Sequence, residues 1–186
     1  EFLANENLLD VVEGIVGPEI TCNPIQHIRA KLPSGLTPTG ADGHVVAWHQ
    51  DAGVTWEEAD PFSILTVWIP VVPATEENGC LQVNPGVHKN KIVYWDGLDQ
   101  DYPMVPVPMK KGDAIFVHKL TPHGSGENKT DGIRWSLDVR YQKSFEPSPR
   151  PEWPSILARS RRDPSIETKF EDWHDAWAEA LEKNPD

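Results

Sequence analysis

The sequence predicts a mainly β protein, with a sandwich or barrel core and flanking helices. Three observations support this fold class. Short segments rich in β-branched and aromatic residues recur between residues 25 and 142. Glycine, proline and asparagine turns separate these segments, as in all-β domains. Helical spacing of apolar residues is confined to the two ends of the chain.

Seven segments have strand character, and they give the order of the predicted core. The segments are Ile25–Leu32, Val45–His49, Ser63–Val72, Cys80–Val83, Pro106–Met109, Asp113–His118 and Ile133–Gln142. Ser63–Val72 has the composition of a buried strand. A polar turn at 76–79 and a loop at 33–43 lie between strands.

The two ends of the chain are predicted to be helical. Asn7–Val16 has apolar residues at helical spacing and is stopped by Gly17-Pro18. Residues 146–154 are proline-rich, so we expect an extended segment there. Ile166–Leu181 has an aromatic stripe, which we expect to pack on the barrel. We therefore predict a single domain over residues 1–186, whose N-terminal part is incomplete because the sequence begins without Met.

The bulk composition argues against several classes of protein. The chain has 186 residues, 38% of them hydrophobic, which is enough for one domain with a buried core. A formal net charge of −12 argues against nucleic acid and anionic membranes as partners. No apolar run approaches the roughly 20 residues that span a bilayer, and we expect no signal peptide. Cys22 and Cys80 form neither a disulfide framework nor a CxxC motif, so the cytoplasm is the expected compartment.

The motif His49-Gln50-Asp51 is the central candidate for chemistry. Side chains at i and i+2 of a strand point to the same face, so His49 and Asp51 project together and Gln50 points away. Two such groups can take neighbouring positions on one metal ion. His123, in the segment 121–126, is the best candidate for a third ligand. Two imidazoles and one carboxylate leave three positions open, which suits non-haem iron(II).

An HxD motif alone is weak evidence for a metal site, because it occurs by chance in many proteins. A single histidine is more often a surface or satisfied core group than a ligand. Five other histidines are alternatives on paper: His27, His44, His88, His118 and His174. The preference for His49, Asp51 and His123 therefore depends on their combination with an arginine further along the chain.

That arginine is Arg134, which follows His123 by 11 positions at the start of Ile133–Gln142. It shares one face of the strand with polar residues, and the apolar residues share the other. A surface strand has the same alternation, so this pattern alone leaves both interpretations open. Inside a barrel, a buried guanidinium needs an anionic partner and binds a carboxylate in bidentate fashion. The distal carboxylate of 2-oxoglutarate fits this role, with Ser125 or Thr66 as an additional hydroxyl donor.

At these residues the chain resembles the phytanoyl-CoA dioxygenase family. The matching stretches are Trp48–Asp51, Asn78–Lys89, Lys111–His118 and His123–Thr130, closed by Arg134. They extend over roughly residues 25–145 in the family's order and spacing. One departure is Pro85-Gly86-Val87-His88, where the family usually has Pro-Gly-Ser-His; this stretch is a turn, so the departure leaves the predicted iron site intact.

The resemblance implies both the fold and the site residues. The implied fold is the double-stranded β-helix, a cupin-like jelly roll. His49, Asp51 and His123 are implied as the iron(II) ligands and the catalytic centre. The implied contacts to 2-oxoglutarate are Arg134, Ser125, Trp68 and Gln26.

The activity implied by the resemblance is that of an Fe(II)- and 2-oxoglutarate-dependent dioxygenase, which uses O2 to hydroxylate a C–H bond of a small-molecule metabolite and releases succinate and CO2. The presence of Asp51 favours hydroxylation, because related halogenases lack this carboxylate. Candidate substrate-facing side chains are Trp56, Tyr94, Trp95, His118 and Arg140.

Two alternatives to this activity remain. The first is a cupin-like metal enzyme that does not use 2-oxoglutarate, and the position of Arg134 argues against it. The second is a non-catalytic jelly-roll binding module, and the intact set of two histidines, one aspartate and the arginine argues against that.

Overall fold

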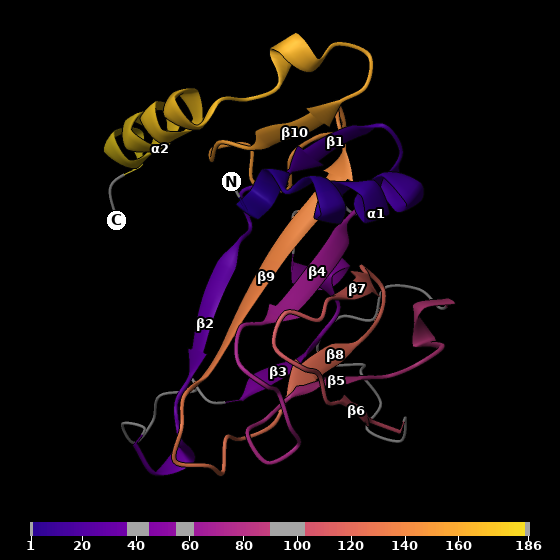
Figure 1. Cartoon of the computed structure of the whole chain (residues 1–186), viewed down its shortest axis with the longest axis vertical. Coiled ribbons are helices and arrows are strands. Elements are labelled where there is room, and N and C mark those ends of the chain that lie inside the picture. The colour runs from indigo at the N-terminus through magenta and orange to yellow at the C-terminus, as the bar shows by residue number, and fades with distance from the viewer. Residues whose placement is uncertain (1, 37–44, 55–61, 90–102, 185–186) are drawn as a thin grey trace. The chain divides into compact units, whose positions relative to one another are not determined.

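The computed structural model describes residues 2–36, 45–54, 62–89 and 103–184 (Figure 1). These residues divide into two compact units. The terminal unit consists of Glu1–Gln26, Thr55–Leu65 and Val139–Asp186, and the central unit consists of His27–Val54 and Thr66–Asp138. The prediction of a single domain over the whole chain stays a prediction.

Two α-helices lie near the ends of the chain, both in the terminal unit, where the apolar spacing predicts them. Helix α1 spans Glu6–Val16 and buries Leu9, Val12 and Val16 on one stripe. The Asn5 side chain accepts a hydrogen bond from the Leu8 amide, which caps the first turn. Helix α2 spans Phe170–Lys183.

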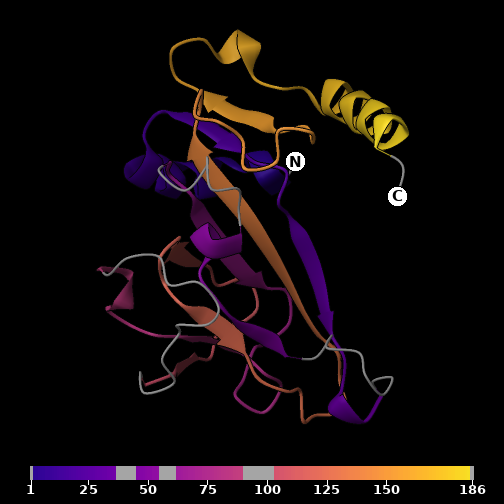
Figure 2. The same ribbon diagram turned by 180° about the vertical axis from the view of Figure 1, so that it is seen from behind.

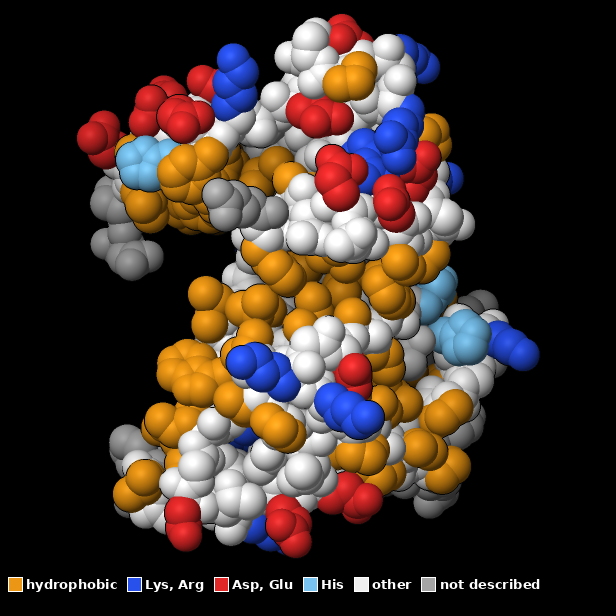
Figure 3. Space-filling view, in the orientation of Figure 1, with side chains coloured by type: hydrophobic (Ala, Val, Ile, Leu, Met, Phe, Trp, Pro, Cys, Tyr) orange, Lys and Arg blue, Asp and Glu red, His pale blue; other side chains and the backbone are white. Residues whose placement is uncertain are grey.

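The aromatic stripe of α2 packs against the segment that precedes it in the terminal unit. Trp153 stacks on Trp177 with ring centroids 5.2 Å apart, and Trp173 meets Trp177 edge to face at 6.2 Å. Figure 3 shows hydrophobic side chains gathered along this helix. Packing of α2 on the barrel stays a prediction.

Strands of the terminal unit form an antiparallel ladder. Strand β1 (Glu19–Cys22) lies between β10 (Ile156–Ser160) and the second half of β9 (Arg134–Lys143). The two views in Figures 1 and 2 both show β1 and β10 side by side. Neither β1 nor β10 is predicted from the sequence, because each is short and lacks a run of β-branched residues.

Strands of the central unit form two sheets. In one, the first half of β9 is paired with β2 (His27–Lys31), β4 (Leu65–Pro70) is a neighbour of β9, and β7 (Ile115–His118) follows β4. The other has the order β3-β8-β5-β6, with bounds Val46–His49, His123–Ser125, Leu81–Val83 and Val105–Val107. The pairings β3–β8, β8–β5 and β5–β6 are antiparallel.

A hydrophobic core joins the two sheets of the central unit. It contains Trp68 from β4, Leu81 from β5 and Val117 from β7, together with Ala74 and Cys80. Short 3-10 turns complete the described chain, at Phe2–Ala4, Ser34–Leu36, Asp51–Val54, Val87–Lys89 and Pro164–Ile166. The mainly β prediction is therefore confirmed. None of the helices within the described residues has the length and apolar character that crossing a bilayer requires.

Candidate metal centre

Two strands of the central unit bring the candidate ligands together. His49 is the last residue of β3, and His123 is the first residue of β8. Because β3 and β8 pair in antiparallel fashion, these two histidines lie opposite each other in the register. The chain leaves β3 through Gln50 and enters a 3-10 turn that begins at Asp51.

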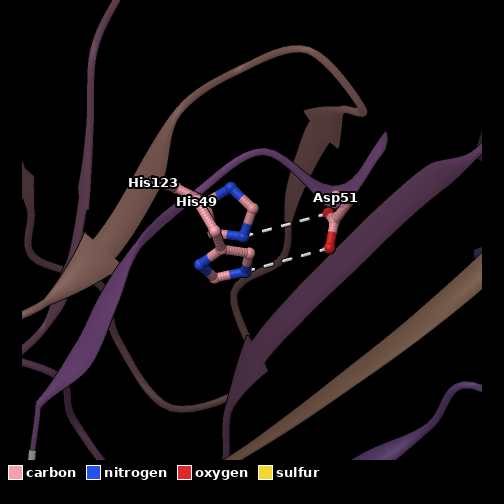
Figure 4. A group of neighbouring side chains, drawn as sticks. All are labelled: His49, Asp51 and His123. Atoms are coloured by element: carbon pink, nitrogen blue, oxygen red, sulfur yellow. Dashed lines mark ion pairs between the residues drawn. The ribbon is translucent and has the colours of Figure 1, made fainter. Parts of the chain in front are cut away.

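The three side chains predicted as ligands converge (Figure 4). Ligand atoms of His49, Asp51 and His123 all lie within 4.8 Å of one another. The Nε2 atom of His49 is 4.0 Å from Asp51 Oδ1, and Nε2 of His123 is 3.8 Å from Asp51 Oδ2. The two imidazole ring centroids are 4.2 Å apart. Within the described residues, this is the one group of at least three such side chains with this spacing.

Backbone carbonyl groups fix the orientation of both imidazoles. His49 Nδ1 lies 2.8 Å from the Ala47 carbonyl oxygen, and His123 Nδ1 lies 2.9 Å from that of Thr121. A carbonyl oxygen only accepts, so in each ring Nδ1 carries the proton and Nε2 presents its lone pair to the cluster. This is the usual second contact of a metal-binding histidine.

Asp51 is fully buried and its carboxylate is oriented by a hydroxyl group. Thr66 Oγ1 on β4 donates a hydrogen bond of 2.6 Å to Asp51 Oδ2. Here the single hydroxyl proton of Thr66 is directed at Asp51, and its alternative role as a donor to the cosubstrate carboxylate stays a prediction. The cluster thus gathers two nitrogen lone pairs and one carboxylate in a site that is almost closed to water. Such a set of donors is stabilised by a cation, and its composition suits non-haem iron(II).

Arg134 is buried as predicted, with 2% of its surface exposed, whereas the adjacent Trp135 is 39% exposed. The polar face of β9 therefore points inward at its start. The Arg134 Nη1 atom donates to Ser136 Oγ at 2.8 Å, and its guanidinium carbon lies 5.2 Å from the centre of the Trp68 ring. Burial lowers the pKa of the guanidinium to about 10. Its Nε atom has no hydrogen-bond partner among the described residues.

Lys31 adds a second cation at the same place. It is paired with Arg134 across β2 and β9 and is 3% exposed, and its ammonium donates to the Gly126 carbonyl oxygen at 2.6 Å. Burial lowers the pKa of Lys31 to about 8, and the positive charge of Arg134 contributes to this shift. Ser125 Oγ is also buried and has no partner within the part of the chain that the structure describes. Two buried cations and two unsatisfied donor groups fit an anionic ligand.

Strands β4 and β8 link the ligand cluster to the buried cations. On β8, His123 belongs to the cluster, and Ser125 carries the hydroxyl group without a partner among the described residues; on β4, Thr66 contacts Asp51 and Trp68 contacts Arg134. In both cases the residues are two apart and so share a face, about 7 Å apart along the strand. A five-carbon dicarboxylate such as 2-oxoglutarate is of comparable length.

Three other predicted residues, Gln26, Arg140 and His118, are not among the members of the ligand cluster. Gln26 is in the terminal unit, where its amide donates to the Asn23 carbonyl oxygen at 3.0 Å and contacts Cys22 Sγ. Its role as a cosubstrate contact stays a prediction. Arg140, also in the terminal unit, is buried and donates to the Ile25 carbonyl oxygen at 3.2 Å. His118 is exposed at the end of β7.

The predictions for Trp56, Tyr94, Trp95 and His44 lie outside the described residues. Lys31 is the principal residue that the sequence prediction missed. Pairing Ile25–Leu32 with Ile133–Gln142 in the register that opposes Lys31 to Arg134 is the signal that could have identified it.

Solved structures have a similar fold. The apo structure of ThoJ, described as a non-haem monooxygenase, superimposes with a TM-score of 0.71 at 20% identity, covering 97% of this chain and 73% of that one. This likeness concerns the fold. The fold and the His–Asp–His cluster together define a cupin-like jelly-roll protein with a candidate metal centre, as the sequence predicts.

Sequence comparison identifies the family. The profile described as Phytanoyl-CoA dioxygenase (PhyH) matches residues 3–136. A probable phytanoyl-CoA dioxygenase of Caenorhabditis elegans is 28% identical over 161 residues, which cover 76% of this chain and 49% of that protein. Methylphosphonate hydroxylase of Gimesia maris is 35% identical over 103 residues, covering 52% of this chain and 40% of that protein. The chain belongs to the phytanoyl-CoA dioxygenase family, and its matched region spans less than half of the length of these two relatives.

Proposed function

We propose that this protein is an Fe(II)- and 2-oxoglutarate-dependent dioxygenase that hydroxylates a C–H bond of a small-molecule metabolite. One arrangement carries the proposal. Strands β4 and β8 connect a buried cluster of two histidines and one aspartate to a group of buried side chains, Arg134, Lys31 and Ser125, that can bind an anion. Family membership supports the same activity.

In this proposal His49, Asp51 and His123 hold the iron. The two Nε2 lone pairs and the Asp51 carboxylate would hold the metal, which when bound would supply the site at which the cosubstrate and O2 react. The Ala47 and Thr121 carbonyl groups keep the imidazoles in the tautomer that binds metal. Thr66 holds the carboxylate in place, so the ligands are oriented before the metal arrives.

Arg134, Lys31 and Ser125 bind the distal carboxylate of 2-oxoglutarate. The Arg134 guanidinium supplies a planar pair of donors, and its contact with the Trp68 ring keeps it aligned. Ser125 supplies a hydroxyl donor that has no partner within the described residues. The cosubstrate anion offsets the charge of Lys31 and Arg134, whose burial is otherwise unfavourable.

Bound iron(II) and 2-oxoglutarate supply the activation of O2 and the oxidation of the substrate, with release of succinate and CO2. The chain itself orients the ligands, neutralises the cosubstrate and excludes water. Asp51 is fully buried and His123 is 6% exposed, so bulk water has little access to the ligand side chains. Retention of Asp51 as a third protein ligand supports hydroxylation as the outcome.

A small-molecule substrate is supported by the names of the relatives, which refer to phytanoyl-CoA and to methylphosphonate. Cys22 and Cys80 are both free and buried, which supports the reducing cytoplasm as the compartment.

The proposed cosubstrate is tested by adding Fe(II) and then 2-oxoglutarate to the protein without oxygen. We expect a visible charge-transfer band from the chelate, and its loss on exposure to O2 together with formation of succinate. Normal iron uptake without a band would contradict the use of 2-oxoglutarate and favour the cupin-like alternative.

Two variants distinguish metal binding from cosubstrate binding. Asp51→Ala removes a ligand and should abolish tight iron binding, whereas Ser125→Ala should keep iron and weaken the response to 2-oxoglutarate. A screen of small molecules for substrate-stimulated succinate release then identifies the substrate class. No iron binding by the unaltered protein would favour the non-catalytic alternative.

A further inference from the structure

We propose that Gln50 is a positioning residue, which fixes the distance between Asp51 and His123 by binding the turn that precedes His123. The inference rests on the proposed metal centre, because it concerns two of its ligands. It assigns a function to the middle residue of the motif His49-Gln50-Asp51, whose side chain does not join the ligand cluster.

The turn Lys119–Thr121 connects the end of β7 to the His123 strand, and it contacts both ligand segments. Three successive carbonyl oxygens of this turn accept hydrogen bonds. The Lys119 carbonyl accepts from the Ala52 amide at 3.2 Å, and the Leu120 carbonyl accepts from Gln50 Nε2 at 2.7 Å. The Thr121 carbonyl accepts from His123 Nδ1 at 2.9 Å.

Two of these bonds flank Asp51 in the sequence. Gln50 precedes Asp51 and Ala52 follows it, and both donate to the turn, by a side chain and by a backbone amide. The backbone on either side of the Asp51 carboxylate is therefore held against the same turn that orients the His123 ring. One short segment thus sets the positions of two ligands that are far apart in the chain.

Gln50 lies where the chain leaves β3 and enters the 3-10 turn, and its side chain is directed at the Leu120 carbonyl group and not at the ligand cluster. The side chain is 1% exposed. Its hydrogen bond to the Leu120 carbonyl is the shortest of the three, and it is the one that a substitution can remove without changing a ligand or a backbone atom.

The turn is itself well held. His118 Nδ1 accepts a hydrogen bond from the Leu120 amide at 3.1 Å, and the His118 carbonyl accepts from the Thr121 amide at 2.8 Å. The Pro122 carbonyl accepts from the Asn84 amide at 2.9 Å. Because hydrogen bonds hold the turn on both sides, its position is fixed. The hydrogen bond from Gln50 therefore fixes the position of Asp51 relative to the turn.

The test replaces Gln50 with methionine, which has a similar shape but no amide donor. Gln142→Met is the matched control: Gln142 is also buried and donates to two backbone carbonyl groups, Glu146 and Pro147, in the terminal unit. The probe is Co(II), whose affinity and visible absorption report the geometry of the centre without turnover. Loss of a supporting contact of this kind weakens metal binding by about 10- to 100-fold.

We expect Gln50→Met to lower Co(II) affinity by this amount and to alter the visible spectrum, while Gln142→Met keeps the affinity and spectrum of the unaltered protein. Equal affinity in Gln50→Met and the unaltered protein would overturn the inference, and so would an equal loss in Gln142→Met. An unaltered protein that binds no Co(II) would overturn the metal centre itself, and the inference with it.

A second pair of variants tests the same turn from its exposed side and carries little risk to folding. His118→Phe removes the acceptor of the Leu120 amide, and His88→Phe alters the neighbouring ring, whose centroid is 5.7 Å from that of His118, without touching the turn's hydrogen bonds. Weaker Co(II) binding in His118→Phe but not in His88→Phe is expected. Unchanged binding in His118→Phe would contradict a role for the turn.

Discussion

At the scale of single residues, the most informative feature is the pair of buried cations Lys31 and Arg134. They lie directly opposite each other on β2 and β9, where like charges are unfavourable. Both are almost fully buried, and burial lowers the pKa of each. An anion that binds between or beside the two charges would offset their mutual repulsion.

Removal of the guanidinium tests this interpretation. Arg134→Ala should weaken 2-oxoglutarate binding by about 10- to 100-fold, because a hydrogen bond to a charged group contributes roughly 1.5–3 kcal/mol. Iron binding should persist, since Arg134 is not one of the candidate iron ligands. Anaerobic titration of the iron-loaded protein measures both quantities, and Arg150→Ala, at an exposed position, is the control. Loss of iron in Arg134→Ala would mean that Arg134 supports the metal centre instead.

The lowered pKa of Lys31 predicts that both the stability of the protein and its affinity for the cosubstrate depend on pH. Its pKa is lowered from 10.5 to about 8 by burial. Between these values the unfolded chain holds the proton that the folded protein has lost, so without an anion the free energy of unfolding rises with pH in this window. Cosubstrate affinity should change in the opposite direction and fall as the pH rises through about 8. Titrations with 2-oxoglutarate from neutral to alkaline pH measure this step, which should be absent in Lys31→Met.

At the scale of elements, the close approach of β3 and β8 determines the spacing of the two histidines. Gly124, between His123 and Ser125, has no side chain, and a Cβ atom there would lie 2.8 Å from the Val46 carbonyl oxygen. Because the obstacle is backbone, it cannot move aside as a flexible side chain could. The pairing of β3 with β8 therefore requires glycine at this position.

Gly124→Ala should accordingly separate the two strands. Overpacking of this kind costs about 1–3 kcal/mol of stability, and we expect a lower Tm together with weaker Fe(II) or Co(II) binding. Gly126→Ala is a close control, since a Cβ atom there would meet only Gln82 Nε2, at 3.9 Å. Thermal unfolding and metal titration of both variants measure the difference. Equal behaviour of the two variants would contradict the role assigned to Gly124.

Strand β4 could be predicted from its run of β-branched and aromatic residues, and β9 from its alternation of apolar and polar residues. Strands β1, β8 and β10 could not, because they are short and owe their extended form to pairing with distant partners. The His-Gly-Ser sequence of β8 has little intrinsic strand preference.

The candidate metal ligands were predictable because two of them stand in one short motif, although the strand ends at His49 and Asp51 begins a 3-10 turn. Lys31 was not, because its importance depends on the register between β2 and β9, which no local pattern reveals. The contact of Thr66 with Asp51 was not predicted for the same reason: it joins β4 to a turn in another part of the chain.

At the scale of the whole molecule, the terminal unit is held by an ion-pair network around Arg159. This side chain on β10 is 3% exposed and pairs with Glu6, Asp10 and Glu13, which all lie on α1. Arg161 also pairs with Glu13. Figure 3 shows the acidic and basic side chains gathered together in this region. Helix α1 is therefore attached to β10 by charge, while its apolar stripe is buried.

This network should make the protein sensitive to acid. Hydrogen bonds from Arg161 and then Arg159 lower the pKa of Glu13 below its usual value of 4.5. A lowered carboxyl pKa gives stability that is present above 4.5 and is lost as the pH falls through the folded-state value. Arg159→Met should reduce the Tm near neutral pH and flatten its decline in acid. Melting curves from pH 7 to pH 3 compare it with Arg162→Met, an exposed control.

The register that sets His49 opposite His123 has a further consequence for how the chain behaves without metal. A bound ion ties together two segments separated by most of the central unit, so it acts as a removable cross-link that closes a long loop. Its withdrawal should free that loop to open locally long before the rest of the molecule unfolds. Protein whose metal has been removed by a chelator should therefore exchange its amide hydrogens faster between these two histidines than in α1, β1 or β10. Proteases should also cleave it sooner there.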